Sequence, residues 1–385
     1  MFERLAADSL RDSANRFPAV AILGARQVGK TTLARAAFPG GAYRDLEDPR
    51  TAERFRDDPR FQLDAAGSAP LILDEAQTVP ELFPALRGAI DARRTANGRY
   101  VVLGSAQPRL VRGIAESLAG RIAVIELDPL AACEAATGDR PFDWRALWLR
   151  GGFPDALRGD FRQWWEAYLR MLLERDLPQY GVAADPPFMR RLLTMLAHQH
   201  GGIFNASAVA SSLGVTYHTI QRHVDVLEAV FLVRRLAPYF RNVGKRLVKA
   251  PKVYLRDSGL LHHLLHIATF DDLANHPSRG ASWEGFVIED IVRRERVARP
   301  ATQPFFWRTA AGAEVDLVLE RGGERVPIEI KAGRGDDGRT VRTLRDALPD
   351  IGATRAWIVD QAPGIELLGP GIARAGFAEV GAGTP

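Results

Sequence analysis

Short apolar runs alternate with amphipathic segments over the first third of the chain. The runs AVAILG, PLILDE, RYVVLGS and RIAVIEL, all within residues 18–130, have the length and composition of buried strands. The segments between them have the apolar spacing of helices. Alternation of this kind is typical of a parallel sheet covered by helices. The pattern therefore predicts an α/β domain over residues 1–140.

The pattern becomes helical over residues 141–200. In FRQWWEAYLRMLLERDLPQY, Trp165, Leu169 and Leu172 recur at helical spacing, which predicts a helical lid or spacer. Residues 201–256 contain two short helical segments separated by a glycine turn and followed by the strand-like run FLVRRLAPYF. This arrangement predicts a winged helix-turn-helix.

A second α/β pattern covers residues 257–385. A helix is followed by the strand-like runs PFFWRT, EVDLVLE and RVPIEIKA, by a helix near 339–348 and by the strand RAWIVD. We expect a further folded domain here. The glycine-rich tail after residue 369 is expected to be loosely held.

Composition narrows the class of protein. The 385 residues are 46% hydrophobic and 25% charged, which excludes a disordered or fibrous chain and allows two or three domains. A formal charge of +4 permits an anionic partner without requiring one. Cys133 is the only cysteine, so an intrachain disulfide and a thiolate zinc site are excluded. Because no run resembles a signal peptide or approaches the ~20 apolar residues of a membrane span, we expect a soluble cytoplasmic protein with no membrane partner.

The segment GARQVGKTT follows the strand VAIL and precedes the helical TLARAAF. It fits the phosphate-loop pattern G-x-x-x-x-G-K-[ST], and both flanks are of the required type. The backbone amides of such a loop wrap the β-phosphate of a nucleotide, its lysine adds a positive charge near the β- and γ-phosphates, and its threonine can ligate Mg²⁺. ATP and Mg²⁺ are therefore the expected cofactors. The expected nucleotide-binding residues are Gly24, Gln27, Val28, Gly29, Lys30, Thr31 and Thr32.

Two acids end the apolar run PLILDEAQ. Beside a phosphate loop, Asp74 is expected to bind in the shell of the Mg²⁺ ion, and Glu75 is expected to orient the attacking water. Ser105, at the end of VVLGS, and the nearby Gln107 are candidates to sense the γ-phosphate, although an ordinary strand end has the same pattern. Arg121 is a candidate to contact a nucleotide, in its own chain or in a neighbouring subunit of a homo-oligomer. A surface salt bridge explains Arg121 equally well.

The helix-turn-helix lies in NASAVASSLGVTYHTIQRHVDVLEAVFLV. Ile220, Val224 and Leu227 mark the buried face of its second helix. The side chains left outward on that helix are of the kind that reads the major groove of DNA: Tyr217, His218, Gln221 and Arg222. The following run RNVGKRLVKAPK has no acid and adds basic residues that include Lys245 and Arg246. DNA is thus the predicted partner, and a protein-docking role is the alternative.

The strand VPIEIKAG carries Glu329 and Lys331 on one face, because they are two positions apart. Asp316 lies inside the apolar run EVDLVLE, and Glu284 shares a helix face with apolar residues in SWEGFVIEDIVRR. Three carboxylates beside one lysine can hold a divalent cation, while the lysine steadies a water or a developing phosphate charge. The predicted metal ligands are therefore Glu284, Asp316 and Glu329, with Lys331 as a catalytic residue. A simple pairing of Glu329 with Lys331, or a nuclease fold without activity, is the alternative.

The pattern E…D…E-x-K resembles that of the restriction-endonuclease-like, or PD-(D/E)xK, superfamily. Over residues 18–360 the chain resembles the prokaryotic AAA-type (AAA+) P-loop ATPases that end in a DUF-class domain, through GARQVGKTTL, LILDEAQTVPELFPALR, ESLAGR, GGFPDAL, PKVYLRDSGL, WEGFVIE and IEIKAG. The resemblance implies an AAA+ core, a winged-helix middle and a nuclease-like α/β end. Where such families have a proline before the metal-binding aspartate, this chain has Glu314 and Val315, a departure that bears on activity.

These observations predict an ATPase that couples its nucleotide state to DNA binding and to metal-dependent DNA cleavage. In one alternative, the protein is a nucleotide-switched regulator whose C-terminal domain is only a scaffold. In the other, it is a signalling ATPase with no DNA partner.

Overall fold

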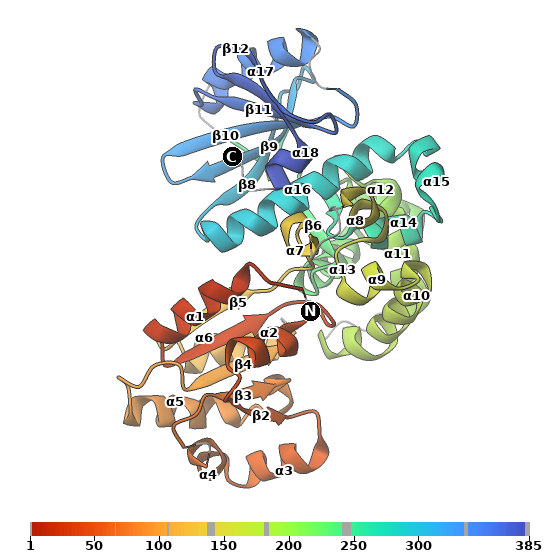
Figure 1. Ribbon diagram of the computed structural model, residues 1–385. Helices are drawn as coiled ribbons and strands as arrows, with labels where there is room; N and C mark the ends of the chain where they lie inside the picture. The colour runs from red at the N-terminus through yellow and green to blue at the C-terminus, as the bar shows by residue number, and fades with distance from the viewer. Residues whose placement is uncertain are drawn as a thin grey trace. The chain divides into compact units, whose positions relative to one another are not determined.

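The computed structural model describes residues 2–65, 67–105, 108–136, 143–180, 185–240, 248–334 and 338–381. The chain divides into two compact units, one formed mainly by Met1–Leu130 and the other by most of the remaining residues. Figure 1 labels most of the helices and strands of both units. Each unit is a fold in its own right, with its own sheet and its own core.

The first unit is built on a five-stranded parallel sheet with the order β2-β3-β4-β1-β5. Its strands are β1 (Ala19–Leu23), β2 (Ala42–Asp45), β3 (Leu71–Asp74), β4 (Tyr100–Gly104) and β5 (Ile122–Glu126). Every position of β1, β3 and β4 is buried, which explains why these strands are continuous apolar runs in the sequence. β5 lies at the edge, and Val124 is 53% exposed, so this predicted buried strand is only half covered.

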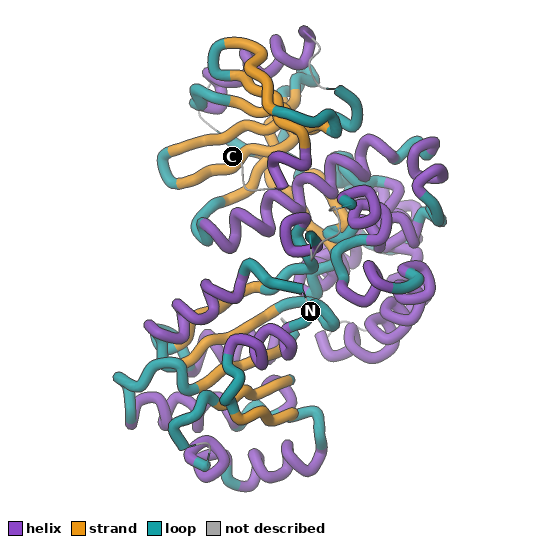
Figure 2. The backbone as a smooth tube through the Cα atoms, in the orientation of Figure 1, coloured by secondary structure: helices purple, strands orange, loops and turns teal. Residues whose placement is uncertain are grey.

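Helices connect these parallel strands, as Figure 2 shows. They are α2 (Lys30–Ala37), α3 (Pro49–Asp57), α4 (Pro59–Asp64), α5 (Leu82–Ala92) and α6 (Pro108–Ser117), and α1 (Ala6–Arg16) precedes β1. Alternate residues of β1, β3 and β4 join Leu86 of α5 and Ile114 of α6 in one apolar core. Because β1 and β3 both run parallel to β4, the loop after β1 and the acids at the end of β3 lie at the same carboxyl edge of the sheet.

The second unit begins with helices. They are α7 (Ala132–Ala135), α8 (Trp144–Arg150), α9 (Pro154–Arg158), α10 (Phe161–Met171) and α11 (Pro186–His198), with a π turn (Leu172–Asp176) and a 3-10 turn (Leu177–Tyr180) after α10. Trp165, Leu169 and Leu172 are all buried, as their helical spacing predicts. Trp148 and Trp283 pack edge to face with ring centroids 5.0 Å apart, which fixes α8 against α16 (Arg279–Ala298).

The segment predicted as a winged helix-turn-helix consists of α12 (Ala206–Leu213), α13 (Tyr217–Ala229) and the antiparallel strands β6 (Val233–Pro238) and β7 (Lys252–Leu255). Gly214 ends α12 with a φ of 67°, a left-handed conformation that favours glycine. Ile220, Val224 and Leu227 are fully buried, so the predicted inner face of α13 is the observed one.

The wing strands belong to a larger sheet of eight strands with the order β12-β13-β11-β10-β9-β8-β6-β7. The other strands are β8 (Gln303–Arg308), β9 (Glu314–Arg321), β10 (Glu324–Ile330), β11 (Ala356–Asp360), β12 (Ile365–Gly369) and β13 (Ile372–Gly376). β6 pairs in parallel with β8 through Ala237 with Phe305 and Pro238 with Phe306. The predicted middle and C-terminal segments are therefore parts of one sheet and one compact unit.

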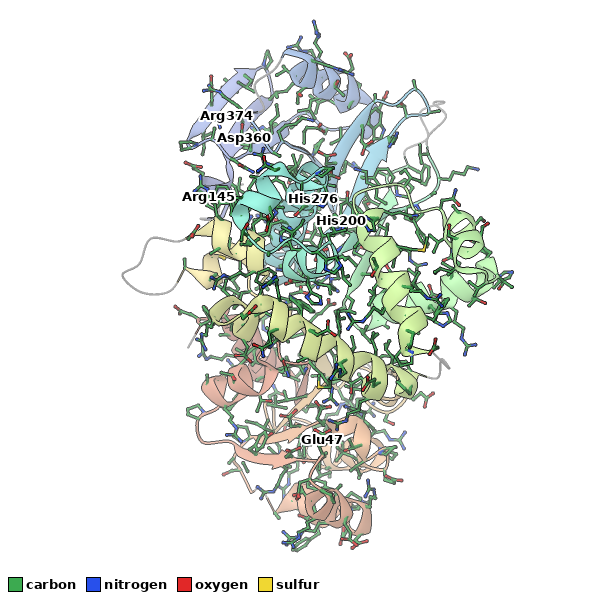
Figure 3. All side chains as sticks on the ribbon, turned by 90° about the vertical axis from the view of Figure 1, so that its right-hand side faces the viewer. Glu47, Arg145, His200, His276, Asp360 and Arg374 are labelled. Atoms are coloured by element: carbon green, nitrogen blue, oxygen red, sulfur yellow. The ribbon has the colours of Figure 1, made fainter. Side chains whose placement is uncertain are left out.

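The helices of this C-terminal region are α14 (Ser258–Leu264), α15 (Phe270–Asn275), α16, α17 (Gly338–Ile351) and α18 (Phe377–Gly381). The expectation of a loosely held tail is wrong for its described part, because β13 lies between β11 and β12 inside the sheet. Arg374 of β13 is buried and donates to Oδ1 of the buried Asp360 over 2.9 Å, a pair labelled in Figure 3. Phe377 is also buried, against Trp144 and Trp283.

Candidate functional site

The loop of residues 24–29 joins β1 to α2 at the carboxyl edge of the first sheet. Gln27 and Gly29 have φ values of 60° and 96°, so the backbone curls in the left-handed region twice within three residues. A Cβ atom on Gly24 would lie 2.3 Å from the carbonyl oxygen of Leu127, which excludes any other residue there. The loop thus has the close-packed, wrapped form that phosphate binding requires.

Lys30 begins α2 and is only 7% exposed. Its Nζ donates to the carbonyl oxygens of Gly24, at 3.1 Å, and Ala25, at 2.8 Å, so the ammonium is folded over the loop itself. A phosphate oxygen is a stronger, charged acceptor than a carbonyl oxygen. Nucleotide phosphates bound in this loop would therefore compete with these carbonyls for Lys30.

Thr31 and Asp74 meet at the same edge. The Thr31 hydroxyl donates to Oδ2 of Asp74 over 2.6 Å, and Oδ1 of Asp74 accepts from the amide of Glu75 over 3.0 Å. A hydroxyl and a carboxylate are the hard oxygen ligands that Mg²⁺ prefers, so this pair fits the metal of a Mg²⁺-nucleotide. The two residues come from elements 43 positions apart, which the sheet brings together.

Tyr43 of β2 is a site residue that sequence reasoning missed. Its hydroxyl donates to the same Oδ2 of Asp74 over 2.9 Å. Burial raises the pKa of the Tyr43 hydroxyl above its ordinary value, and the nearby Asp74 raises it further, so the group remains a donor at physiological pH. The four-residue strand AYRD carries no motif that could have indicated this contact.

Glu75 has a φ of 52°, in the left-handed region that a non-glycine residue seldom occupies. The side-chain amide of Gln77 donates to its carboxylate. Oε1 of the buried Gln77 and Oγ of the buried Ser105 have no hydrogen-bond partner among the described residues. Buried polar atoms without a partner are few in folded proteins and are typical of sites that bind water or a ligand. Gln107 lies outside the described residues.

Arg121 and Arg4 are placed differently with respect to the loop. Arg121 precedes β5, at the amino edge of the sheet, and pairs with Asp91 through contacts of 2.8 and 3.0 Å, which is the surface salt bridge that the sequence left open. The prediction that Arg121 serves the nucleotide of its own chain is therefore wrong, because the phosphate loop lies at the opposite, carboxyl edge. Arg4 instead supports the loop, with donors 2.7 Å from the carbonyl oxygen of Val28 and 2.6 Å from that of Asp128.

In the helix-turn-helix, Tyr217, His218 and Arg222 are exposed on α13. Gln221 is half-buried and is held by the Tyr217 hydroxyl and by Arg235, each at 2.9 Å. Arg235 of β6 also pairs with two acids of α13, Asp225 and Glu228. Lys245 and Arg246 lie outside the described residues.

The predicted metal ligands of the C-terminal region lie together, but around a lysine. Glu284 of α16 accepts from Nζ of Lys252 at 2.8 Å, and Oδ1 of Asp316 in β9 lies 3.6 Å from the same nitrogen. Glu329 of β10 pairs with Lys331 at 2.6 Å, which is the alternative that the sequence left open. Among the described residues, no group of three His, Cys, Asp or Glu side chains is placed to hold a metal ion.

The assignments of Glu284, Asp316 and Glu329 as metal ligands, and of Lys331 as a catalytic residue, are corrected accordingly. These residues do not fit a metal centre, because ammonium groups already engage the carboxylates: Lys252 engages Glu284 and Asp316, and Lys331 engages Glu329. Burial alone would lower the pKa of Lys252, but Glu284, Asp316 and Glu314 together raise it above its ordinary value. Lys252 is therefore a permanent cation within this cluster.

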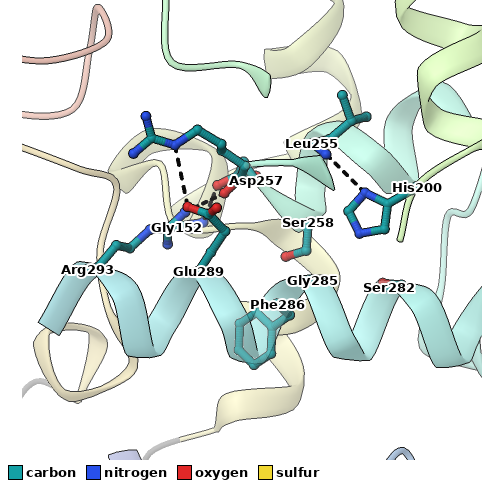
Figure 4. A pocket seen from close by; sticks show the side chains of 11 residues that line it. Gly152, His200, Leu255, Asp257, Ser258, Ser282, Gly285, Phe286, Glu289 and Arg293 are labelled. Atoms are coloured by element: carbon teal, nitrogen blue, oxygen red, sulfur yellow. Dashed lines mark hydrogen bonds and ion pairs between the residues drawn. The ribbon is translucent and has the colours of Figure 1, made fainter. Parts of the chain in front are cut away.

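A second polar cluster explains three sequence motifs that carry no catalytic pattern, GGFPDAL, PKVYLRDSGL and WEGFVIE. They meet at a small cavity drawn in Figure 4, whose lining includes His200, Asp257 and Glu289. Asp257 accepts from the amide of Gly152 at 2.8 Å and from that of Gly259 at 2.9 Å.

Glu289 pairs with Arg234 and with Arg256 in the same cluster. Burial alone would raise the pKa of Glu289, but Arg234 and Arg256 lower it to about 2. The buried charges are therefore paired, and the cluster holds the three segments together.

The wrapped loop and the Thr31–Asp74 contact on a parallel sheet define a P-loop ATPase of the AAA type, and residues 16–136 match the family described as "AAA domain". Residues 141–271 and 279–366 match families described as "Domain of unknown function", DUF8612 and DUF4143. The curated proteins "Uncharacterized protein Rv2008c" of Mycobacterium tuberculosis and "Uncharacterized protein Mb2031c" of Mycobacterium bovis are each 41% identical over 366 residues, which is 92% of this chain and 79% of theirs. The chain belongs to the same family as these two mycobacterial proteins.

Among solved structures, the chain is similar to the Walker-type ATPase PABY2304 of Pyrococcus abyssi, with 16% identity, a TM-score of 0.49 and coverage of 69% of this chain and 96% of that one. It is also similar to the RuvB Holliday junction branch migration motor of Thermotoga maritima, with 17% identity, a TM-score of 0.31 and coverage of 61% and 90%. Within the part of the chain that the structure describes, no helix is long and apolar enough to cross a membrane.

Proposed function

We propose that this protein binds ATP with Mg²⁺ at the loop of residues 24–29 and hydrolyses it. The observation that carries the proposal is the 2.6 Å contact between Thr31 and Asp74 directly beside that loop. The loop amides and Lys30 bind the phosphates, and Thr31 and Asp74 hold the Mg²⁺ ion, which neutralises charge on them. Glu75, on its strained backbone, orients the attacking water.

The test compares ATP hydrolysis by the natural protein with that by Lys30→Ala, with and without Mg²⁺. Lys30→Ala is expected to lose hydrolysis while its unfolding temperature stays close to that of the natural protein, because the ammonium donates to carbonyl oxygens of the loop itself. Arg94→Ala, which removes a cation that is 65% exposed, is the matched control and should hydrolyse ATP normally. Unchanged hydrolysis by Lys30→Ala would falsify the assignment of the site.

The proposal extends to DNA binding by the winged helix. Tyr217, His218 and Arg222 are exposed on the amino-terminal half of α13, the part of such a helix that contacts base edges in other winged helices. Asp225 and Glu228, which would repel phosphates, are engaged by Arg235. Nucleotide state and DNA affinity are proposed to be coupled, so DNA should change the rate of ATP hydrolysis.

Binding to a fluorescent duplex at several salt concentrations tests this extension. The natural protein should bind more weakly as the salt concentration rises. Arg222→Ala should weaken binding by about 1–3 kcal/mol, the cost of one lost base contact. Asp225→Ala is the control on the same helix and should not weaken binding. If the natural protein binds no DNA and DNA leaves hydrolysis unchanged, the second candidate holds: a signalling ATPase whose winged helix docks on protein.

Metal-dependent DNA cleavage is not part of the proposed function, because Lys252 engages the expected metal ligands. Assembly into a homo-oligomer and a cytoplasmic location, where ATP and Mg²⁺ are abundant, belong to the proposal. For Arg121 to serve a neighbouring subunit, it would first have to leave Asp91.

A further inference from the structure

The ammonium of Lys252 lies among carboxylates from two elements, α16 and β9. Lys252 lies on the wing strand β7, and its side chain is only 3% exposed. Its Nζ lies 2.8 Å from Oε1 of Glu284 and 3.6 Å from Oδ1 of Asp316, and it also pairs with Oε1 of Glu314. Glu284 and Glu314 are therefore direct partners of the ammonium, and Asp316 adds a third negative charge just beyond hydrogen-bond distance.

One oxygen of each of the three predicted metal ligands accepts from a protein donor other than Lys252. Oε1 of Glu284 also accepts from the Tyr254 hydroxyl at 2.5 Å. Oδ2 of Asp316 accepts from the amide of Ile330 at 2.9 Å, and Oε1 of Glu329 accepts from Lys331 at 2.6 Å. Mg²⁺ needs about six oxygen ligands near 2.1 Å, so binding it here would require these contacts to break.

We infer that the Lys252 ammonium takes the place of a divalent metal ion in this cluster. The cluster is therefore structural and does not bind Mg²⁺ or Mn²⁺. The residues that would form a metal centre serve instead to bind the wing. Lys252 comes from β7, whereas its partners come from α16 and β9. The cluster therefore fixes the winged helix to the C-terminal sheet, independently of any activity at the nucleotide loop.

Removing the ammonium should uncover the cation site. Lys252→Ala leaves the oxygens of Glu284, Glu314 and Asp316 without their shared cation, and opens space beside them. One oxygen, Oε2 of Glu329, is already buried without a hydrogen-bond partner among the described residues. Carboxylate oxygens in such a setting are the ligands that Mn²⁺ and Mg²⁺ prefer.

The experiment measures Mn²⁺ binding to the nucleotide-free full chain by electron paramagnetic resonance. We expect the natural protein and Asp316→Asn to bind Mn²⁺ equally weakly. Lys252→Ala should bind one additional Mn²⁺ at least about tenfold more tightly, because a buried like charge has been removed. That additional site should be absent from the double variant Lys252→Ala with Asp316→Asn. Lys249→Ala, which removes a neighbouring lysine outside the cluster, should behave as the natural protein does.

Two results would overturn the inference. One is Mn²⁺ binding by the natural protein that is lost in Asp316→Asn, which would show a metal centre already present. The other is a folded Lys252→Ala that binds no additional Mn²⁺. If Lys252→Ala does not fold, Lys252→Gln, which keeps hydrogen-bond donors, is used in its place. The comparison of the natural protein with Asp316→Asn still shows whether a metal centre is present. In either lysine variant, Mn²⁺ should raise the unfolding temperature, and in the natural protein it should not.

Discussion

The hydroxyl of Tyr43 and the carboxylate of Asp74 are joined by a hydrogen bond of 2.9 Å, on the same oxygen that accepts from Thr31. Oδ2 of Asp74 is thus oriented from both sides, by a residue of β2 and by a residue of α2. A carboxylate that holds a Mg²⁺ ion needs such support, because its orientation sets the position of the metal. Tyr43 is therefore a positioning residue for the proposed reaction.

Tyr43→Phe should raise the Mg²⁺ concentration needed for half-maximal ATP hydrolysis by about 2- to 10-fold, the equivalent of one hydrogen bond of about 0.5–1.5 kcal/mol. Phenylalanine keeps the ring on which the Arg35 guanidinium stacks at 4.0 Å, so only the hydroxyl is tested. A Mg²⁺ titration of hydrolysis measures the effect, and Tyr217→Phe is the matched control. An unchanged titration would show that Thr31 alone orients Asp74.

Glu75→Gln should bind ATP with nearly natural affinity and hydrolyse it at least about 100-fold more slowly. The amide cannot accept a proton from water, whereas a carboxylate acting as a general base contributes about 10²- to 10⁴-fold. Nucleotide binding by fluorescence and single-turnover hydrolysis measure the two effects separately. Glu81→Gln, at an exposed position nearby, should leave both unchanged. Loss of ATP binding in Glu75→Gln would assign the residue to binding and not to hydrolysis.

The second unit should lose stability as the pH falls below about 6.5. Burial lowers the pKa of His200 to about 3 and that of His262 to about 4, so both are neutral in the folded chain. The unfolded chain takes up protons at these residues near pH 6.5, and their contribution is complete above that pH. Each histidine should therefore lower the free energy of unfolding by up to about 1.4 kcal/mol per pH unit as the pH falls from 6.5 towards 4.

Denaturant unfolding followed by tryptophan fluorescence measures this, because all seven tryptophans lie at or after Trp144 and report on the second unit. His200→Gln should flatten the dependence on pH. His218→Gln, at an exposed position on α13, should leave it unchanged. A His200→Gln protein with the slope of the natural protein would contradict the role given to burial of this ring.

Asp257→Ala should lower the free energy of unfolding of the second unit by about 3 kcal/mol or more. It leaves the amides of Gly152, Gly259 and Leu260 without their acceptor in a buried place. The matched control is Asp160→Ala, because Asp160 is an exposed residue that caps α10 and should cost only about 1 kcal/mol. Equal losses in the two variants, by the same fluorescence measurement, would mean that Asp257 is an ordinary helix cap.

The nucleotide loop could be predicted because its signal is local. The glycines, Lys30 and Thr31 lie within eight positions, and the flanking strand and helix are visible as apolar patterns. Arg4 and Tyr43 could not be predicted, because they reach the site from distant or short elements without a motif. Gln77 is close in sequence to Glu75, but the sequence does not show that the turn between them directs the Gln77 amide at the Glu75 carboxylate.

The carboxylates of the C-terminal region differ from the nucleotide loop, because the sequence predicts their convergence but not their partner. Their convergence was predicted from strand and helix periodicity, and Glu284 and Asp316 do lie together. The cation at the centre of the cluster could not be predicted, because Lys252 lies 32 positions before Glu284, at the end of the basic run RNVGKRLVKAPK, where nothing in the sequence sets it apart from the other basic residues. The glycine-rich tail likewise predicts a loosely held segment, because the sequence does not show that Arg374 pairs with Asp360 and holds β13 in the sheet.

The pairing of β6 with β8 has a consequence for how this protein can be divided. A shortened chain that ends after β7 would leave the backbone of β6 open along one side, and exposed strand edges promote association between chains. The winged helix is therefore not a module that could be exchanged between proteins by itself. For any partner that the winged helix recognises, a functional chain must keep both the winged helix and the sheet that completes it.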